Sequence, residues 1–73
     1  MPYVKIEITR EGTTREQKAA LIKGVTDLIS DTLNKDPQLT YVVIQEYDLD
    51  DWGLAGELVS DLRKKGITAE RKK

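Results

Sequence analysis

The chain has no cysteine and no histidine among its 73 residues. Without cysteine it forms no disulfide, and without either residue type it lacks the usual ligands of a structural zinc site. A single core in a chain below about 80 residues rarely contributes more than roughly 3–5 kcal/mol. The composition therefore predicts one domain that gains further stability by oligomerisation.

Long apolar runs and an excess of one charge are also missing. No apolar run approaches the roughly 18 residues of a membrane-spanning helix, and the net charge is only −1. We therefore expect neither membrane nor nucleic-acid binding. The first residues lack the basic and apolar regions of a secretory signal. Because cysteine-free chains suit a reducing compartment, we expect a cytoplasmic protein.

The first part of the chain carries clear strand and helix patterns. Residues 3–9 alternate apolar and polar side chains, which is typical of a half-buried strand. Thr14 and Gln17 have the spacing of a capping box at a helix start, and Thr13 with Glu16 fits one residue earlier. The sequence therefore predicts a strand followed by a helix.

The helix carries an apolar stripe at helical spacing. Its members are Leu21, Ile22, Val25, Leu28, Ile29, Thr32 and Leu33. Pro37 is predicted to stop the helix, since it disfavours helical dihedrals at the preceding residue. Residues 39–45, apolar on both faces at their centre, are predicted to form a second strand. Residues 58–65 fit either a short helix or a hairpin arm, and 66–73 are predicted to be a basic, flexible tail.

This order of elements predicts an α+β fold with a β-α-β protomer. We expect residues 1–65 to form the single domain. Two parallel strands joined by a helix leave one sheet face and both sheet edges uncovered. A second copy of the chain is the simplest cover, so we expect oligomerisation to complete the sheet.

Pro2, directly after the initiator Met1, is the leading candidate for acid–base chemistry. If Met1 is removed, Pro2 presents a secondary amine, and an unperturbed α-amino group has a pKa of about 8. The chain has no histidine or cysteine, so no other group titrates naturally near pH 7. If Met1 is retained, the Pro2 nitrogen is an amide and cannot act as a base.

Four features together resemble the 4-oxalocrotonate tautomerase family. They are Pro2 at the processed terminus, the helix start Glu16-Gln17-Lys18, the β-α-β body, and the aromatic–glycine element Trp52-Gly53-Leu54-Ala55-Gly56-Glu57. The resemblance spans residues 2 to about 64. It implies short subunits that assemble as a hexamer, a trimer of dimers.

The resemblance also implies a chemistry. The amino-terminal proline of this family is a general base that converts enol or dienol forms of small 2-oxo acids to ketones, without metal or organic cofactor. By resemblance, Pro2 takes this role. The implied substrate is like 4-oxalocrotonate or 2-hydroxymuconate, and the implied partner is another copy of the chain in a homo-oligomer.

The substrate-binding positions depart from the family pattern. Thr13 stands where the family has an arginine, and Tyr41 stands where a second arginine reaches into a neighbouring site. Trp52 replaces an active-site phenylalanine and adds an indole N–H. We expect Arg10, Tyr41 and Trp52 to bind substrate. Two further candidates for binding a carboxylate are Arg15 and Arg63. These departures count against the classical dicarboxylate substrate but leave the base in place.

Three alternatives to a base-catalysed tautomerase remain open at this stage. In the first, the same fold is a non-catalytic oligomeric module that binds a ligand or partner. In the second, Pro2 is a charged acid in hydration or decarboxylation. A third and weaker alternative is a nucleic-acid binder that uses the basic residues at the C-terminus, although no aromatic residue lies among them.

Overall fold

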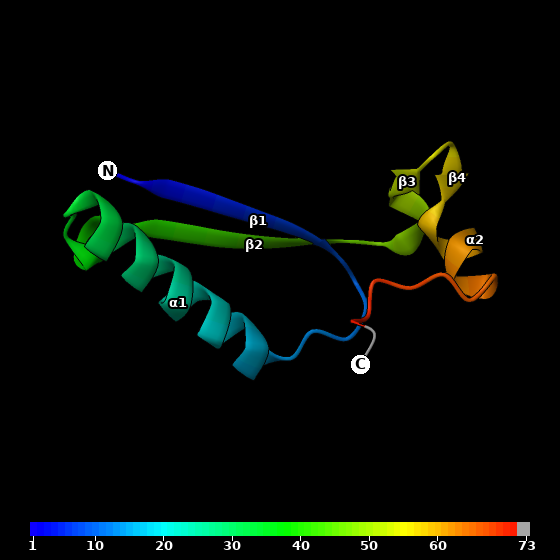
Figure 1. Cartoon of the computed structure of the whole chain (residues 1–73), viewed down its shortest axis with the longest axis horizontal. Helices are drawn as coiled ribbons and strands as arrows, with labels where there is room; N and C mark the ends of the chain where they lie inside the picture. The colour runs from blue at the N-terminus through cyan, green and yellow to red at the C-terminus, as the bar shows by residue number, and fades with distance from the viewer. Residues whose placement is uncertain (72–73) are drawn as a thin grey trace.

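The computed structural model describes residues 1–71 of the chain (Figure 1). Its elements, in order, are β1 (Tyr3–Thr9), α1 (Arg15–Leu33), the 3-10 helix η1 (Pro37–Leu39), β2 (Tyr41–Tyr47), the 3-10 helix η2 (Leu49–Asp51), β3 (Gly53–Leu54), β4 (Glu57–Leu58) and α2 (Val59–Lys64). This order confirms the predicted α+β fold and β-α-β body. We call residues 49–71 the C-terminal arm.

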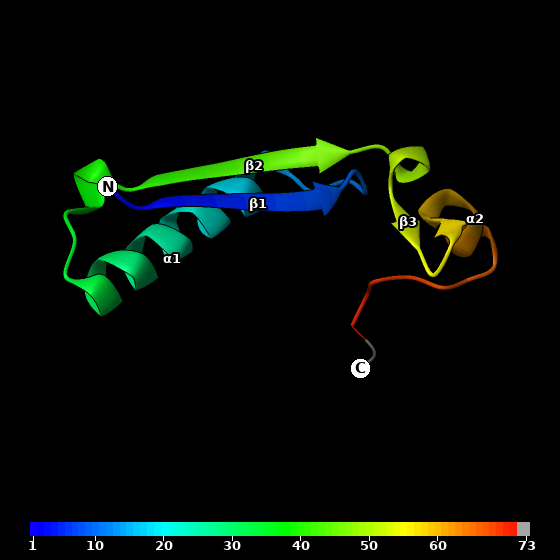
Figure 2. The same cartoon turned by 90° about the horizontal axis from the view of Figure 1, so that it is seen from above.

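β1 and β2 form a parallel pair that α1 covers on one face (Figures 1 and 2). The register runs from Tyr3 opposite Tyr41 to Thr9 opposite Tyr47. Successive side chains of a strand point to opposite faces. The even-numbered residues from position 4 to position 8 are half-buried, whereas Tyr3, Lys5 and Glu7 are exposed. One protomer therefore leaves the second face of its sheet open.

Helix α1 begins and ends as the sequence predicts. The Thr14 hydroxyl accepts a hydrogen bond from the Gln17 backbone N–H, and the Gln17 side chain accepts one from Thr14, which completes the capping box. The helix stops at Leu33, because Asn34 adopts the left-handed conformation with φ of 54°. The alternative start at Thr13 is not used.

The second strand begins two residues later than predicted. Instead of continuing an extended chain from Leu39, residues 37–39 form η1. The Asp36 carboxylate accepts a hydrogen bond from the Gln38 backbone N–H at 2.9 Å, and Pro37 supplies the φ angle that a first helical position needs. The capped turn therefore delays the start of β2 to Tyr41, although the apolar pattern begins at Leu39.

The C-terminal arm contains a hairpin and a short helix, the two alternatives that the sequence left open for residues 58–65. β3 and β4 form a two-residue hairpin whose central residues, Ala55 and Gly56, both have positive φ, the geometry that matches the twist of paired strands. Helix α2 then ends at Lys64, and Gly66 follows with φ of +85°. The Ile67 N–H donates to the Leu62 carbonyl, which turns the chain back in a Schellman motif.

The residues after α2 form no helix or strand up to position 71. The Arg63 guanidinium donates to the Ile67 carbonyl at 2.9 Å, so the start of this segment lies against α2. Positions 72 and 73 of the expected basic tail lie outside the described residues. The flexible tail stays a prediction.

One protomer has little core of its own. Among residues 1–71, only Val59 and Leu62 are almost fully buried, at 4% and 5% exposure. The Cα radius of gyration is 15.3 Å, against about 11 Å for a compact domain of this length. Several members of the predicted apolar stripe are exposed, with Leu28 at 64%. Within residues 1–71, neither helix combines the length and apolar character needed to cross a membrane.

Candidate active site

Pro2 lies at the end of the sheet where β1 begins. Its carbonyl accepts a hydrogen bond from the Tyr41 backbone N–H at 2.9 Å, which extends the β1–β2 ladder by one residue. Pro2 is half-buried, and the Tyr41 residue is 53% exposed. Until Met1 is removed, the Pro2 nitrogen belongs to a peptide bond. The sheet thus holds the position of Pro2 beside Tyr41.

Arg10 and Trp52 lie at the opposite end of the sheet. The Arg10 N–H donates to the Tyr47 carbonyl at 2.7 Å, and its guanidinium pairs with Asp48 at 2.5 Å. The Trp52 ring meets the Tyr47 ring edge to face, with centroids 5.7 Å apart and planes at 72°. Arg10 and Trp52 therefore both contact Tyr47, the last residue of β2.

The four candidate site residues thus fall into two pairs. A seven-residue strand spans about 20 Å, and β1 separates Pro2 and Tyr41 from Arg10 and Trp52. No side chain reaches across that distance. A site that uses all four residues needs groups from more than one protomer.

Arg63 is held by a carboxylate rather than being free to bind a substrate. Its Nε and Nη2 donate to the two carboxylate oxygens of Glu11 at 3.0 and 2.8 Å, and the Thr9 hydroxyl donates to the same carboxylate at 2.6 Å. The hydrogen bonds from Arg63, and then that from Thr9, lower the pKa of Glu11 to about 2. This cluster ties the end of β1 to α2.

Sequence reasoning missed the Glu11–Arg63 pair. The two residues are 52 positions apart, and no periodicity or local motif links them. Arg63 was a candidate carboxylate binder, and its actual carboxylate is Glu11 of the same chain. Arg15, another candidate, is exposed at the first position of α1.

Acid should weaken the cluster between Glu11 and Arg63. A carboxylate with a lowered folded-state pKa stabilises the fold above its unfolded-state pKa, and this contribution is lost as pH falls through the folded-state value. The window therefore runs from about 4.5 down to about 2. We expect Glu11→Gln to lower the urea midpoint at pH 7 and the difference from the parent chain to shrink below pH 4. A difference that stays constant from pH 7 to pH 3, at one protein concentration, would contradict this.

Other charged groups are also paired. The Tyr47 hydroxyl donates to Glu7 at 2.6 Å, which lowers the pKa of Glu7 and raises the pKa of Tyr47. Lys18 of α1 forms an ion pair with Glu46 of β2. Within residues 1–71, no three side chains of metal-ligand type are grouped closely enough to hold an ion.

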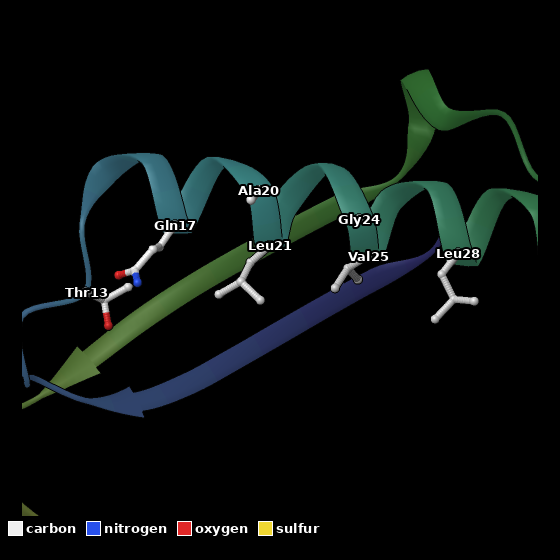
Figure 3. A pocket seen from close by; sticks show the side chains of 7 residues that line it. All are labelled: Thr13, Gln17, Ala20, Leu21, Gly24, Val25 and Leu28. Carbon is white, nitrogen blue, oxygen red and sulfur yellow. The ribbon is translucent and has the colours of Figure 1, made fainter. Parts of the chain in front are cut away.

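A hollow lies elsewhere, along α1. It measures about 650 Å³ and is lined by Thr13, Gln17, Ala20, Leu21, Gly24, Val25 and Leu28, as Figure 3 shows. None of these side chains can exchange a proton near neutral pH. We therefore assign the chemistry to the ends of the sheet and regard this hollow as uncovered apolar surface.

Comparison with known proteins identifies the family of this chain. Residues 2–62 match the model of a family described as tautomerase enzyme. The chain belongs to the tautomerase family. It is 52% identical to "Probable tautomerase K2" of Dickeya dadantii (strain 3937) over 64 residues, which cover 88% of this chain and 96% of that protein. The resemblance seen in the sequence is thereby confirmed.

Solved tautomerase structures share the fold. The crystal structure of DmpI from Helicobacter pylori matches with a TM-score of 0.81 and 43% identity, covering 86% of this chain and 97% of that one. A heterohexamer 4-oxalocrotonate tautomerase from Chloroflexus aurantiacus J-10-fl matches with a TM-score of 0.79 and 25% identity, covering 86% and 100%. Tautomerases are isomerases, so the chain is an enzyme of that class. This favours the enzyme over the non-catalytic module.

Proposed function

We propose that the mature chain is a cofactor-independent tautomerase in which Pro2 is the general base. It interconverts the enol or dienol and keto forms of a small 2-oxo acid, of the general kind of 4-oxalocrotonate and 2-hydroxymuconate. The observation that carries this proposal is the position of Pro2. Its carbonyl accepts a hydrogen bond from the Tyr41 backbone N–H. Removal of Met1 would therefore leave a secondary amine fixed at the end of a sheet.

The proposed reaction moves one proton and needs no oxidant or reductant. The unprotonated Pro2 amine takes a proton from the substrate and leaves an enolate. The resulting ammonium returns the proton to another atom of the same conjugated system, which completes the isomerisation. Donors such as Arg10, the Tyr41 hydroxyl and the Trp52 indole N–H would stabilise the negative charge on the enolate oxygen.

The proposed site is shared between copies of the chain. Pro2 and Tyr41 of one protomer would meet Arg10 and Trp52 of another, because one strand separates the pairs within a protomer. The open sheet face and the exposed apolar face of α1 support a homo-oligomer. We propose the hexamer, a trimer of dimers, as its form, and the heterohexamer found for the Chloroflexus relative supports that form.

Arg10 already has a carboxylate partner in the free protomer. Asp48 holds its guanidinium at 2.5 Å, and both side chains are about 60% exposed. Such exposed pairs contribute little to stability, typically about 0–1 kcal/mol. A substrate carboxylate would therefore replace Asp48 at low cost. The cytoplasmic location and the lack of nucleic-acid or membrane partners stay predictions from the sequence.

The pH profile tests the direction of proton transfer. If the Pro2 amine acts as a base, kcat/KM for an enol substrate should fall about tenfold for each pH unit below the Pro2 pKa and level off above it. We expect the midpoint below about 8, because burial against an apolar wall such as Trp52 disfavours the ammonium. Intact mass should show loss of Met1. Activity that instead falls as pH rises through the midpoint would assign Pro2 as an acid.

A further inference from the structure

The C-terminal arm encloses a second, smaller hollow beside Trp52, which we call the Trp52 pocket. Its volume is about 270 Å³. Its apolar wall is formed by Trp52, Leu54, Val59, Ile67 and Ala69. Ligand pockets usually measure roughly 300–1,000 Å³, so this one suits a single ring or a short branched chain. Two threonines and Arg63 complete the lining.

Among residues 1–71, Arg63 is the one charged residue that lines the Trp52 pocket, and Glu11 already neutralises its charge. Nε and Nη2 donate to Glu11, and Nη1 donates to the Ile67 carbonyl at 2.9 Å. The Arg63 and Glu11 side chains are only 21% and 28% exposed. A ligand carboxylate entering the pocket would compete with Glu11 for Arg63 and would place two negative charges together. An uncharged group meets no such penalty.

We propose that the Trp52 pocket receives the uncharged, apolar end of the substrate, so that the preferred substrate is a 2-oxo acid with one carboxylate and an aryl or branched alkyl group on C3. This inference rests on the proposed function, in which Arg10 binds the single carboxylate. Glu11 is then a positioning residue for specificity, since it keeps Arg63 from attracting a second carboxylate. Trp52 supplies a flat face for the substituent.

A binding measurement tests the pocket without relying on catalysis. Trp52 is the chain's single tryptophan, so its fluorescence reports directly on the site. We would titrate the full processed chain with phenylpyruvate and with 2-oxoglutarate, a monoacid and a diacid. We expect phenylpyruvate to bind about tenfold more tightly, because an unmatched charge costs more than an apolar group gains. Equal affinity or tighter binding of the diacid would overturn the proposal.

Two variants separate specificity from folding. Glu11→Gln keeps the shape of the side chain but frees the Arg63 charge, so the ratio of phenylpyruvate to 2-oxoglutarate affinity should fall about tenfold. The control is Glu57→Gln, which removes the exposed pair with Lys65 in the same arm and should leave the ratio unchanged. If Glu11→Gln does not fold, Ala69→Leu replaces it. By filling the pocket, Ala69→Leu should weaken phenylpyruvate binding alone.

Kinetics then distinguish this inference from the proposed function. In the parent chain, kcat/KM for phenylenolpyruvate should exceed that for 2-hydroxymuconate, and Glu11→Gln should narrow the gap. If Pro2-dependent tautomerisation is present but neither the binding ratio nor the kcat/KM ratio responds to Glu11→Gln or Ala69→Leu, the inference is wrong and the proposed function stands. If the binding ratio responds but no Pro2-dependent rate is found, the proposed function is wrong and the pocket assignment stands.

Discussion

A chain in which one added residue caps the Pro2 nitrogen should tautomerise enol substrates about 10²–10⁴ times more slowly than the chain that begins at Pro2, because general-base catalysis typically contributes that factor. The cap turns the amine into an amide, which has no basic lone pair. It changes no side chain of β1, α1 or the C-terminal arm. The measurement is kcat/KM for phenylenolpyruvate, with intact mass to verify each amino terminus.

Pro2→Ala is the informative second variant. Alanine at the same place keeps an α-amino group with a pKa of about 8 but loses the ring that fixes its direction. We expect a smaller loss of kcat/KM than in the capped chain and a pH profile of the same shape. Equal rates for the capped chain and the parent chain would show that the Pro2 nitrogen is not the base.

The β-α-β body could be predicted closely because its signals are local. Strand alternation, the capping box at Thr14 and the stop before Pro37 each involve residues within a few positions of one another. The start of the second strand was missed because two local patterns compete there. Both an apolar run and a capped 3-10 turn fit residues 37–40, and the hydrogen bond from Gln38 to Asp36 decides between them.

The candidate site was only partly predictable. The importance of Pro2 follows from its chemistry in a chain without histidine or cysteine. The resemblance also pointed to Tyr41, Arg10 and Trp52. It did not show that Tyr41 lies beside Pro2 while Arg10 and Trp52 lie at the other end of the sheet. Ion pairs such as Glu11–Arg63 depend on how the arm folds back over the end of β1, and no sequence spacing encodes that contact.

Mixing two weakly active chains should restore activity if the site is shared. The first chain carries the capped Pro2 nitrogen, and the second carries Arg10→Ala, which removes the proposed carboxylate binder. Each alone lacks one part of every site. In a closed oligomer, random exchange at equal amounts gives about a quarter of the sites an intact Pro2 from one protomer and an intact Arg10 from its neighbour. We therefore expect kcat/KM to rise toward about a quarter of the parent value.

The outcome decides where the two halves of the site meet. If both pairs acted within one protomer, neither mixed chain would hold an intact site, and the mixture would show only the average of its two components. The exchange must be allowed to occur, so the chains are mixed under mild denaturation and then diluted, with the parent chain treated in parallel. The matched control replaces Arg10→Ala with Lys23→Ala, which removes only an exposed ion pair on α1 and leaves Arg10 in place. That chain should be active before mixing, because Lys23 lies on α1 and away from both ends of the sheet that carry the proposed site.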